Sequence, residues 1–313
     1  MFGTAPMSTV RIAHLSDPHI LDLAGVPTHK LVFNKRFTGW VNLKLKRGSH
    51  HKPWVVEAMM DDLRAHRVDH VVVTGDLTNL ALDPEFARAR EMLERMGYGP
   101  DELSVIPGNH DVYTRGAERT QRFARHFAPY FTSDVAVEGA GHASGLFPFV
   151  RLRGEVAIVG LSTAVARLPI VSSGHAGASQ LAALARVLDL PEVRSRTPVI
   201  LSHHPITNPR GAVGTALRGW SEVGELRRAL SVGRDTLALH GHLHHRVHER
   251  IAAEGGATIH RLGATSASLL ADDPRAMSGY NVYEVSAAGL ERASARVYDA
   301  ASKGFVERAL PEA

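Results

Sequence analysis

Residues 70–79 read HVVVTGDLTN, and this stretch decides the fold. Its first five residues are mostly β-branched, which favours a strand, and the Gly-Asp pair that follows ends it. A helix from Pro53 to His66 is expected before it, with Pro53 at the first helical position. A second helix is expected from Asp83, acting as the cap, to about Met96. A short strand between two helices is typical of α/β proteins with parallel strands.

The same alternation of short apolar strands and helices recurs along the chain. Helices are expected around residues 115–127, 177–188 and 221–231. From about residue 246 the pattern changes to antiparallel strands joined by glycine turns, which predicts a C-terminal β-meander over about 246–298. We therefore expect one α/β domain spanning residues 1–313. The strands expected before the meander are Val10–Ser16, Leu103–Ile106, Val156–Leu161, Pro198–Leu201 and Thr236–Leu239.

The composition is that of an ordinary globular protein, with 44% hydrophobic and 22% charged residues, which excludes a disordered chain. No apolar run reaches the roughly 18 residues of a membrane span. The first ten residues lack the basic and apolar regions of a secretory signal, so a cytoplasmic location is expected. The chain has no cysteine, which excludes disulfides, thiolate metal sites and cysteine nucleophiles.

Five polar clusters stand where predicted strands end. Because ligand sites in α/β sheets lie at the carboxyl ends of strands, the five clusters predict one shared site. Their donors are carboxylate, amide oxygen and imidazole, a set that suits Mn, Fe, Zn or Co better than Mg alone. The chain is also rich in histidine, with 19 residues. The clusters are Asp17-Pro18-His19, Gly75-Asp76-Leu77-Thr78-Asn79, Gly108-Asn109-His110-Asp111, His203-His204-Pro205 and Gly241-His242-Leu243-His244.

Seven donors in these clusters can fill two metal sites and leave positions for water and substrate. In an extended segment, Asp-x-His and His-x-His place both side chains on the same side. Asp76 follows a glycine, so its carboxylate can lie between two cations and bridge them. Two ions about 3.5–4 Å apart generate hydroxide and stabilise an in-line displacement at phosphorus. The seven expected ligands are Asp17, His19, Asp76, Asn109, His203, His242 and His244.

The five clusters, in this order over residues 17–244, resemble the calcineurin-like metallophosphoesterase superfamily. The resemblance implies a four-layer αββα sandwich, in which two mixed β-sheets are flanked by helices around a dinuclear centre. It also implies a metal-dependent phosphoric ester hydrolase that uses two Mn, Fe or Zn ions per chain.

The resemblance also divides the donors between two ions bridged by Asp76. It implies that His110 is not a ligand but protonates the leaving oxygen or stabilises the transition state, with Asp111 orienting it. The pattern of His, any residue, Pro favours His203 as a ligand, and leaves open whether His204 contacts substrate or packs. Asn79 is expected to support the site or to cap a turn. The implied ligand sets are Asp17, His19 and His244 for one ion, and Asn109, His203 and His242 for the other.

Within the superfamily, the chain looks most like the bacterial cyclic-nucleotide phosphodiesterase branch, which includes glycerophosphodiester hydrolases. The Asp-Pro-His start, the His-His-Pro block and a Gly-Glu-Leu stretch ending at Leu226 carry this likeness. The hypothesis is a phosphodiesterase that uses attack by metal hydroxide on a small-molecule or lipid phosphoester. The alternative is a hydrolase of a lipid-linked phosphate or pyrophosphate, similar to UDP-diacylglucosamine hydrolases. A nuclease ranks third, and a non-catalytic scaffold is disfavoured because every donor and His110 are present.

Residues 24–52 form a basic, aromatic insertion directly after the first metal cluster. It has no acidic residue, and aromatic residues at helical spacing could form an apolar stripe. Three interpretations remain open for residues 30–52: a cap that attracts the substrate phosphate, a peripheral element that docks on anionic lipid at the inner membrane face, and a solvated loop or homodimer contact. Nucleic-acid binding is disfavoured, since no stacking platform or further basic stripe supports it.

Overall fold

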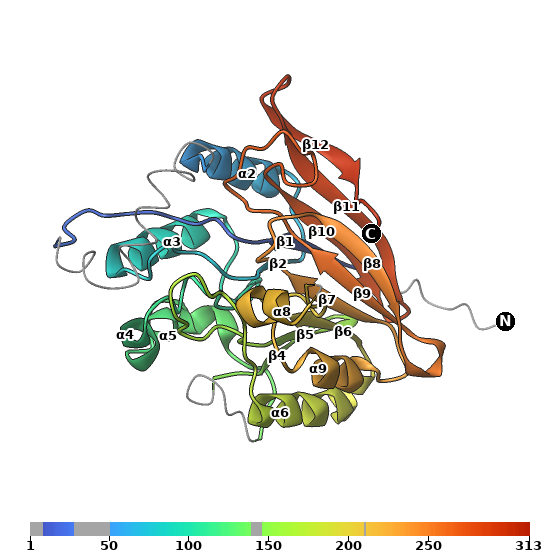
Figure 1. Ribbon diagram of the computed structural model, residues 1–313. Helices are drawn as coiled ribbons and strands as arrows, with labels where there is room; N and C mark the ends of the chain where they lie inside the picture. Colours follow the sequence, from blue (N-terminus) through green and yellow to red (C-terminus); the bar gives the residue numbers. More distant parts are fainter. Residues whose placement is uncertain (1–8, 28–50, 139–145, 210) are drawn as a thin grey trace.

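Two mixed β-sheets, each with six strands among the described residues, form the centre of the structure (Figure 1). The computed structural model describes residues 9–27, 51–138, 146–209 and 211–313, so most of the basic insertion lies outside the described residues. The first sheet has the order β12-β11-β10-β1-β2-β3 and the second the order β4-β5-β6-β7-β9-β8. The first sheet contains β1 (Val10–Leu15), β2 (His70–Val73), β3 (Leu103–Val105), β10 (Gly279–Ser286), β11 (Gly289–Asp299) and β12 (Gly304–Ala309). The second contains β4 (Phe149–Arg153), β5 (Val156–Gly160), β6 (Thr197–Leu201), β7 (Thr236–His240), β8 (Val247–Ala252) and β9 (Thr258–Gly263).

Alternate side chains of the second sheet enter two different cores. Val156 and Ile158 of β5 belong to the core that the second sheet shares with the first. Ala157 and Val159, which point to the opposite face, pack with helices in a separate core. This period of two places the second sheet between two apolar layers. Two mixed sheets flanked by helices confirm the predicted fold class.

Helices cover the outer faces of both sheets. On the first sheet, α2 (Pro53–Ala65) buries Val56, Met60 and Leu63, spaced so that they share one helix face. Beside it, α3 (Asp83–Arg95) begins at Asp83 with Leu82 in the cap position, so the predicted cap is wrong by one residue. The long helices of the second sheet are α6 (Ala178–Asp189) and α9 (Val223–Leu230). The short helices are α4 (Arg115–Arg119), α5 (Arg122–Phe127), η3 (Ala128–Phe131), α7 (Pro191–Arg194), α8 (Ala212–Arg218) and η4 (Glu254–Gly256).

The strands that follow residue 246 divide between the two sheets instead of forming one meander. β8 and β9 are an antiparallel hairpin in which β9 runs parallel to β7 and β8 is the edge strand of the second sheet. β10 crosses to the first sheet and pairs antiparallel with β1, followed by β11 and β12. Alternating sequence predicts strands but not their partners, so this exchange between sheets could not be read from it.

Parallel strands of both sheets end at one common edge. β1, β2 and β3 are parallel neighbours in the first sheet, as are β5, β6 and β7 in the second. The two edges are in contact, because the His203 ring nitrogen Nδ1 lies 2.7 Å from the carbonyl oxygen of Thr74. The loops after β1, β2, β3, β6 and β7 therefore meet between the sheets. Of the helices in the described parts of the chain, none combines the length and apolar character needed to cross a membrane.

Candidate metal centre

Left-handed backbone positions turn the donor side chains toward one another. Five of the seven expected ligands have positive φ: Asp17 (52°), His19 (48°), Asp76 (52°), His242 (66°) and His244 (54°). The expectation of extended Asp-x-His and His-x-His segments was therefore wrong, although the side chains still converge. Such a conformation costs a residue with a side chain roughly 1–2 kcal/mol. Cross-loop hydrogen bonds hold it, including Asp17 N to Gly75 O (3.0 Å) and His19 N to Asp76 O (3.1 Å).

Two glycines allow the loops to approach closely. A Cβ atom on Gly108 would overlap the carboxylate and amide of Asp76. One on Gly241 would overlap the side chains of Ser16 and Asp17. Only glycine therefore fits at these two contacts between loops.

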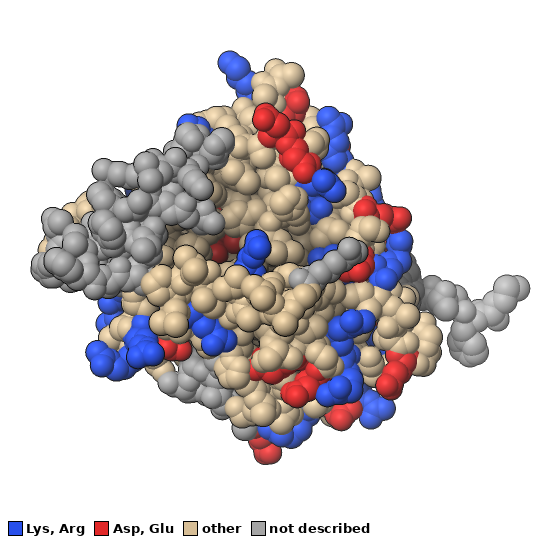
Figure 2. All heavy atoms as spheres, viewed as in Figure 1, with Lys and Arg blue, Asp and Glu red and all other residues tan. Residues whose placement is uncertain are grey.

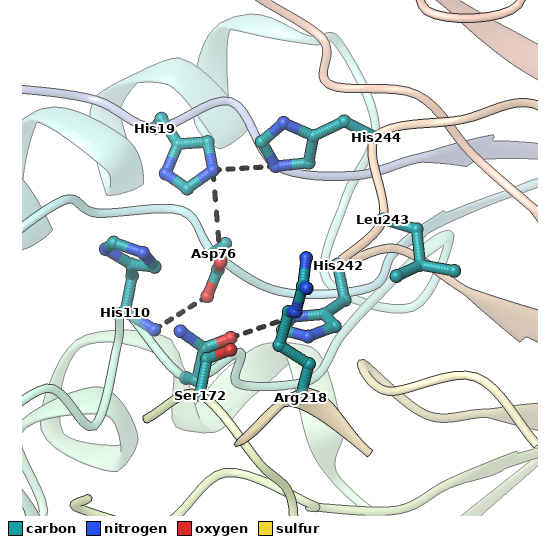
Figure 3. A pocket seen from close by; sticks show the side chains of 9 residues that line it. His19, Asp76, His110, Ser172, Arg218, His242, Leu243 and His244 are labelled. Atoms are coloured by element: carbon teal, nitrogen blue, oxygen red, sulfur yellow. Dashed lines mark hydrogen bonds and ion pairs between the residues drawn. The ribbon is translucent and has the colours of Figure 1, made fainter. Parts of the chain in front are cut away.

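One group of donors comes from the loops after β1 and β7. The Nε2 atom of His244 lies 3.1 Å from Asp17 Oδ1. It also lies 3.1 Å from the Nε2 atom of His19 (Figure 3). The His19 Nε2 atom is also 3.7 Å from Asp17 Oδ1. One donor atom from each of these three residues lies within 4.8 Å of the others, a spacing that allows a shared metal ion. The structure thus brings the first expected ligand set together.

Asp76 lies between this group and a second one. Its Oδ2 atom is 3.9 Å from Nε2 of His19 and 3.4 Å from Nε2 of His203. The side-chain oxygen of Asn109 lies 3.1 Å from His203 Nε2 and 3.0 Å from His242 Nδ1. All seven expected ligands therefore meet at one place, with the Asp76 carboxylate between two groups of donors.

The electrostatics of the donors fit cations. Asp17 and Asp76 are buried, and among the described residues they form ion pairs with histidines only. Burial alone would raise the pKa of each carboxyl group, but the histidines hold the pKa of Asp17 and of Asp76 well below the usual range. Burial likewise opposes charge on His203, yet Asp76 raises the pKa of His203 to about 9. A buried set of carboxylate, amide and imidazole donors that favours positive charge suits transition-metal ions.

The ring of His110 is oriented by a backbone carbonyl. Its Nδ1 atom lies 2.7 Å from the carbonyl oxygen of Asn79, and its backbone N–H donates to Asp76 Oδ1 at 2.7 Å. Asp111, expected to orient His110, instead accepts hydrogen bonds from the amides of Gly108 and Thr78, both at 2.9 Å. Burial and the nearby Asp76 raise the pKa of Asp111 to about 7. The predicted role of Asp111 is therefore corrected: it fixes the loops, and Asn79 fixes the ring.

His204 packs within the protein. Its Nδ1 atom lies 2.7 Å from the Thr163 hydroxyl, and its Nε2 atom 2.7 Å from the carbonyl oxygen of Ser172. The side chain is fully buried, and its ring lies 4.5 Å from that of His242. Both ring nitrogens are thus used within the chain, so His204 anchors the loop of residues 163–174 beside the metal ligands.

The donors open into a cavity of about 270 Å³ that contains a residue the sequence analysis missed. Arg218, the last residue of α8, lines this cavity together with His242 (Figure 3). It is the one Lys or Arg among the described residues that line the cavity. His51 was also missed, and its ring lies 5.3 Å from that of His19. Arg218 belongs to no recognisable cluster, whereas His51 lies at the end of the insertion of residues 24–52 without a motif that marks it as a site residue. The cavity is lined by His19, Asp76, Asn109, His110, Ser172, Arg218, His242, Leu243 and His244.

Several solved structures share this fold at low sequence identity. A dimetal phosphatase from Danio rerio superposes with a TM-score of 0.57 at 14% identity, covering 96% of this chain and 99% of that one. The purple acid phosphatase PPD1 from yellow lupin seeds gives 0.53 at 12% identity, covering 96% and 53%. The sulfate thiohydrolase SoxB from Thermus thermophilus gives 0.50 at 15% identity, covering 98% and 59%. This chain thus spans little more than half the length of the last two proteins.

Sequence comparison identifies the family. No curated protein matches the chain. The sequence model of the calcineurin-like phosphoesterases matches residues 10–246, which is most of the chain and includes all five polar clusters. The chain therefore belongs to the calcineurin-like phosphoesterase family and is a metal-dependent phosphoric ester hydrolase.

Proposed function

We propose that this protein is a phosphodiesterase with two metal ions, held by the seven expected ligands. The observation that carries the proposal is the position of Asp76, whose Oδ2 atom lies 3.9 Å from His19 Nε2 and 3.4 Å from His203 Nε2. A carboxylate so placed can serve two ions at once. Bound ions of this kind polarise a phosphoryl oxygen and activate water as a nucleophile. Elemental analysis of the purified protein distinguishes Mn, Fe and Zn.

Arg218 supports a diester as the substrate. A guanidinium group presents several N–H donors in a planar fork that matches two oxygens of a phosphate group. A phosphodiester carries one negative charge on two non-bridging oxygens, so one arginine beside the ions complements it. A monoester at neutral pH carries more negative charge and has a third such oxygen. We therefore assign to Arg218 the binding of the substrate phosphate.

His110 is placed to supply the proton that the reaction needs. Hydrolysis of a diester breaks one P–O bond, and the departing oxygen must gain a proton as the product alcohol forms. The Nδ1–H group of His110 donates to Asn79, which leaves Nε2 to carry the proton that is transferred. His110 is one of the residues that line the cavity. We therefore propose His110 as the general acid.

The substrate class follows the resemblance noted in the sequence. A cyclic nucleotide or a glycerophosphodiester is the leading candidate, and a lipid-linked phosphate or pyrophosphate is the second. The second is favoured by a specific observation, the exposed apolar side chains beside the cavity.

The experiment compares a diester and a monoester on the metal-loaded protein. We expect faster hydrolysis of bis-p-nitrophenyl phosphate than of p-nitrophenyl phosphate, with two ions per chain by elemental analysis. Hydrolysis of the monoester alone would overturn the diester assignment, and one ion per chain would overturn the dinuclear one. A panel of cyclic nucleotides, glycerophosphodiesters and UDP-linked lipids then separates the two candidate classes.

A further inference from the structure

Exposed apolar side chains gather next to the metal cavity. Ile170, Val213 and Leu168 are 89%, 74% and 72% exposed, the highest fractions among the large hydrophobic residues in the described ranges. They lie on two neighbouring segments, the loop of residues 163–174 and helix α8, which are joined by a hydrogen bond from Ser172 N to Leu217 O (2.8 Å). We call Leu168, Pro169, Ile170 and Val213 the apolar ridge.

The backbone of the ridge is held in a fixed form. Ile170 has φ +65°, which is rare for a β-branched residue and therefore strained. The turn is closed by a hydrogen bond from Val171 N to Leu168 O (3.2 Å), and the Arg167 guanidinium donates to the carbonyls of Ser173 and Gly174 at 3.0 Å. His204 holds the other side of the loop through Ser172. The chain thus keeps an exposed Ile170 in an unfavourable conformation by several contacts.

Helix α8 adds an apolar face without a partner among the described residues. Its sequence is AVGTALR, yet none of its seven residues is buried. An apolar helix on the surface of a protein buries its side chains only when another surface covers them. Figure 2 shows mostly uncharged surface around the place where Figure 1 puts α8, with Lys or Arg side chains at its border.

The charged residues that line the hollow beside the ridge are arginines. Residues 156–188 and 193–221, which include both segments of the ridge, contain no acidic residue. A hollow of about 640 Å³ beside the ridge is lined by Arg115 and Arg167 together with Leu168 and Val171, and by no carboxylate among its described lining residues. Apolar side chains flanked by arginines are complementary to a layer of anionic headgroups over acyl chains.

The ridge adjoins the mouth of the metal centre. Ser172 lines the metal cavity, while its neighbours Val171 and Ser173 line the hollow. On α8, Arg218 lines the metal cavity and Ala216 lines the hollow. We propose that the apolar ridge inserts into an anionic lipid surface, with Arg115 and Arg167 at the headgroups. This inference rests on the proposed function and selects the second of its two candidate classes, a phosphoester carried by a lipid in that surface.

The test measures sedimentation of the full-length, metal-loaded protein with vesicles. Binding is expected to vesicles of phosphatidylcholine mixed with phosphatidylglycerol, and not to phosphatidylcholine alone. Ile170→Asn is the informative variant, because asparagine accepts a positive φ and removes the apolar side chain without straining the loop. We expect it to weaken binding at least tenfold, and the pair Leu168→Asn and Ile170→Asn to abolish it. Metal content should stay at its wild-type value, and the melting temperature should not fall.

The matched control is Trp54→Asn, which removes an exposed apolar side chain from α2, outside the ridge. This variant should bind vesicles as the wild type does. The proposal is overturned if the wild type ignores anionic vesicles, or if Ile170→Asn binds as well as the wild type does. It is also overturned if the ridge instead joins two copies, seen as a dimer in size-exclusion chromatography that Ile170→Asn dissociates. Vesicle binding needs no turnover. A failure of the diesterase proposal in the hydrolysis experiment and a failure of the docking proposal in the vesicle experiment can therefore be told apart.

Discussion

Asp76 uses both oxygens of its carboxylate at the centre of the site. Oδ1 accepts the backbone N–H of His110 at 2.7 Å, and Oδ2 lies between the rings of His19 and His203. The first contact positions the proposed general acid, and the second links the two groups of donors. A change at this one side chain therefore affects both the metals and the proton donor.

Replacing Asp76 by alanine should remove metal from both positions, because each loses a negatively charged ligand. We expect less than one ion per chain by elemental analysis of the purified variant. Asp61→Ala, which removes an exposed carboxylate from α2, should retain the wild-type metal content and serves as the control. Two ions at full occupancy in Asp76→Ala would show that this carboxylate is not a bridge.

Arg218→Gln should weaken the binding of the substrate phosphate while leaving the metals in place. Loss of a charged hydrogen bond of about 1.5–3 kcal/mol corresponds to roughly a tenfold to hundredfold fall in kcat/KM for diesters. Inhibition by inorganic phosphate should weaken in parallel, and Arg218→Lys should recover part of both. The control is Arg227→Gln on α9, an exposed arginine that does not line the cavity. Unchanged phosphate inhibition in Arg218→Gln would exclude the contact.

At the scale of the elements, β2 contains a buried histidine whose protonation opposes folding. His70 is fully buried, with its Nε2 atom 2.8 Å from the Ser104 hydroxyl on β3. Burial, together with Arg153 and Arg151, lowers the pKa of His70 to about 3. As the pH falls, His70 is therefore protonated near pH 6.5 in the unfolded chain, but only near pH 3 in the folded protein.

The folding free energy should depend on this histidine as the pH falls. As the pH falls from 6.5 to about 3, His70 lowers the free energy of unfolding by up to about 1.4 kcal/mol per pH unit. Above pH 6.5 the neutral histidine has no such effect. Urea unfolding of the wild type and of His70→Gln should give a shallower pH slope for the variant in this window. Equal slopes would mean that His70 is protonated in the folded state.

Some elements could be predicted from the sequence, and others could not, for physical reasons. Strands such as β2 and β6 are short buried runs, and the polar clusters that follow them converge because parallel strands end together. Helix α8 has only seven residues, too few for an apolar period to stand out in the sequence, so it and Arg218 were missed. The Asn79 carbonyl that orients His110 was missed because every residue has a backbone carbonyl, so the sequence carries no sign of this role.

For the whole molecule, the position of the metal centre between the sheets matters most. Asp17, Asp76 and Asn109 follow strands of the first sheet, whereas His203 and His242 follow strands of the second. Ions held by both groups would bind the folded protein and not the unfolded chain. Metal binding should therefore stabilise the contact between the two sheets.

Removal of the metals should lower the stability of the entire protein. A ligand present at 100 times its Kd stabilises the folded state by about 2.7 kcal/mol, and two ions add their effects. Calorimetry with and without a chelator should show a single transition that moves to lower temperature when the metals are removed. Re-addition of Mn or Zn should restore it. An unchanged melting temperature would mean that the ions do not join the sheets.

The left-handed backbone at five of the expected ligands implies a trade-off between hydrolytic activity and the stability of the folded, metal-free protein. Glycine adopts that conformation without a steric cost, whereas histidine and aspartate adopt it at a cost, although more readily than most other residues. Replacing His19 or His242 by glycine would abolish hydrolysis and remove this steric cost of about 1–2 kcal/mol at each position, while also removing the contacts of the side chain and adding conformational entropy to the unfolded chain. The loops that hold the ligands therefore carry a conformational cost that serves hydrolysis and not the stability of the metal-free protein.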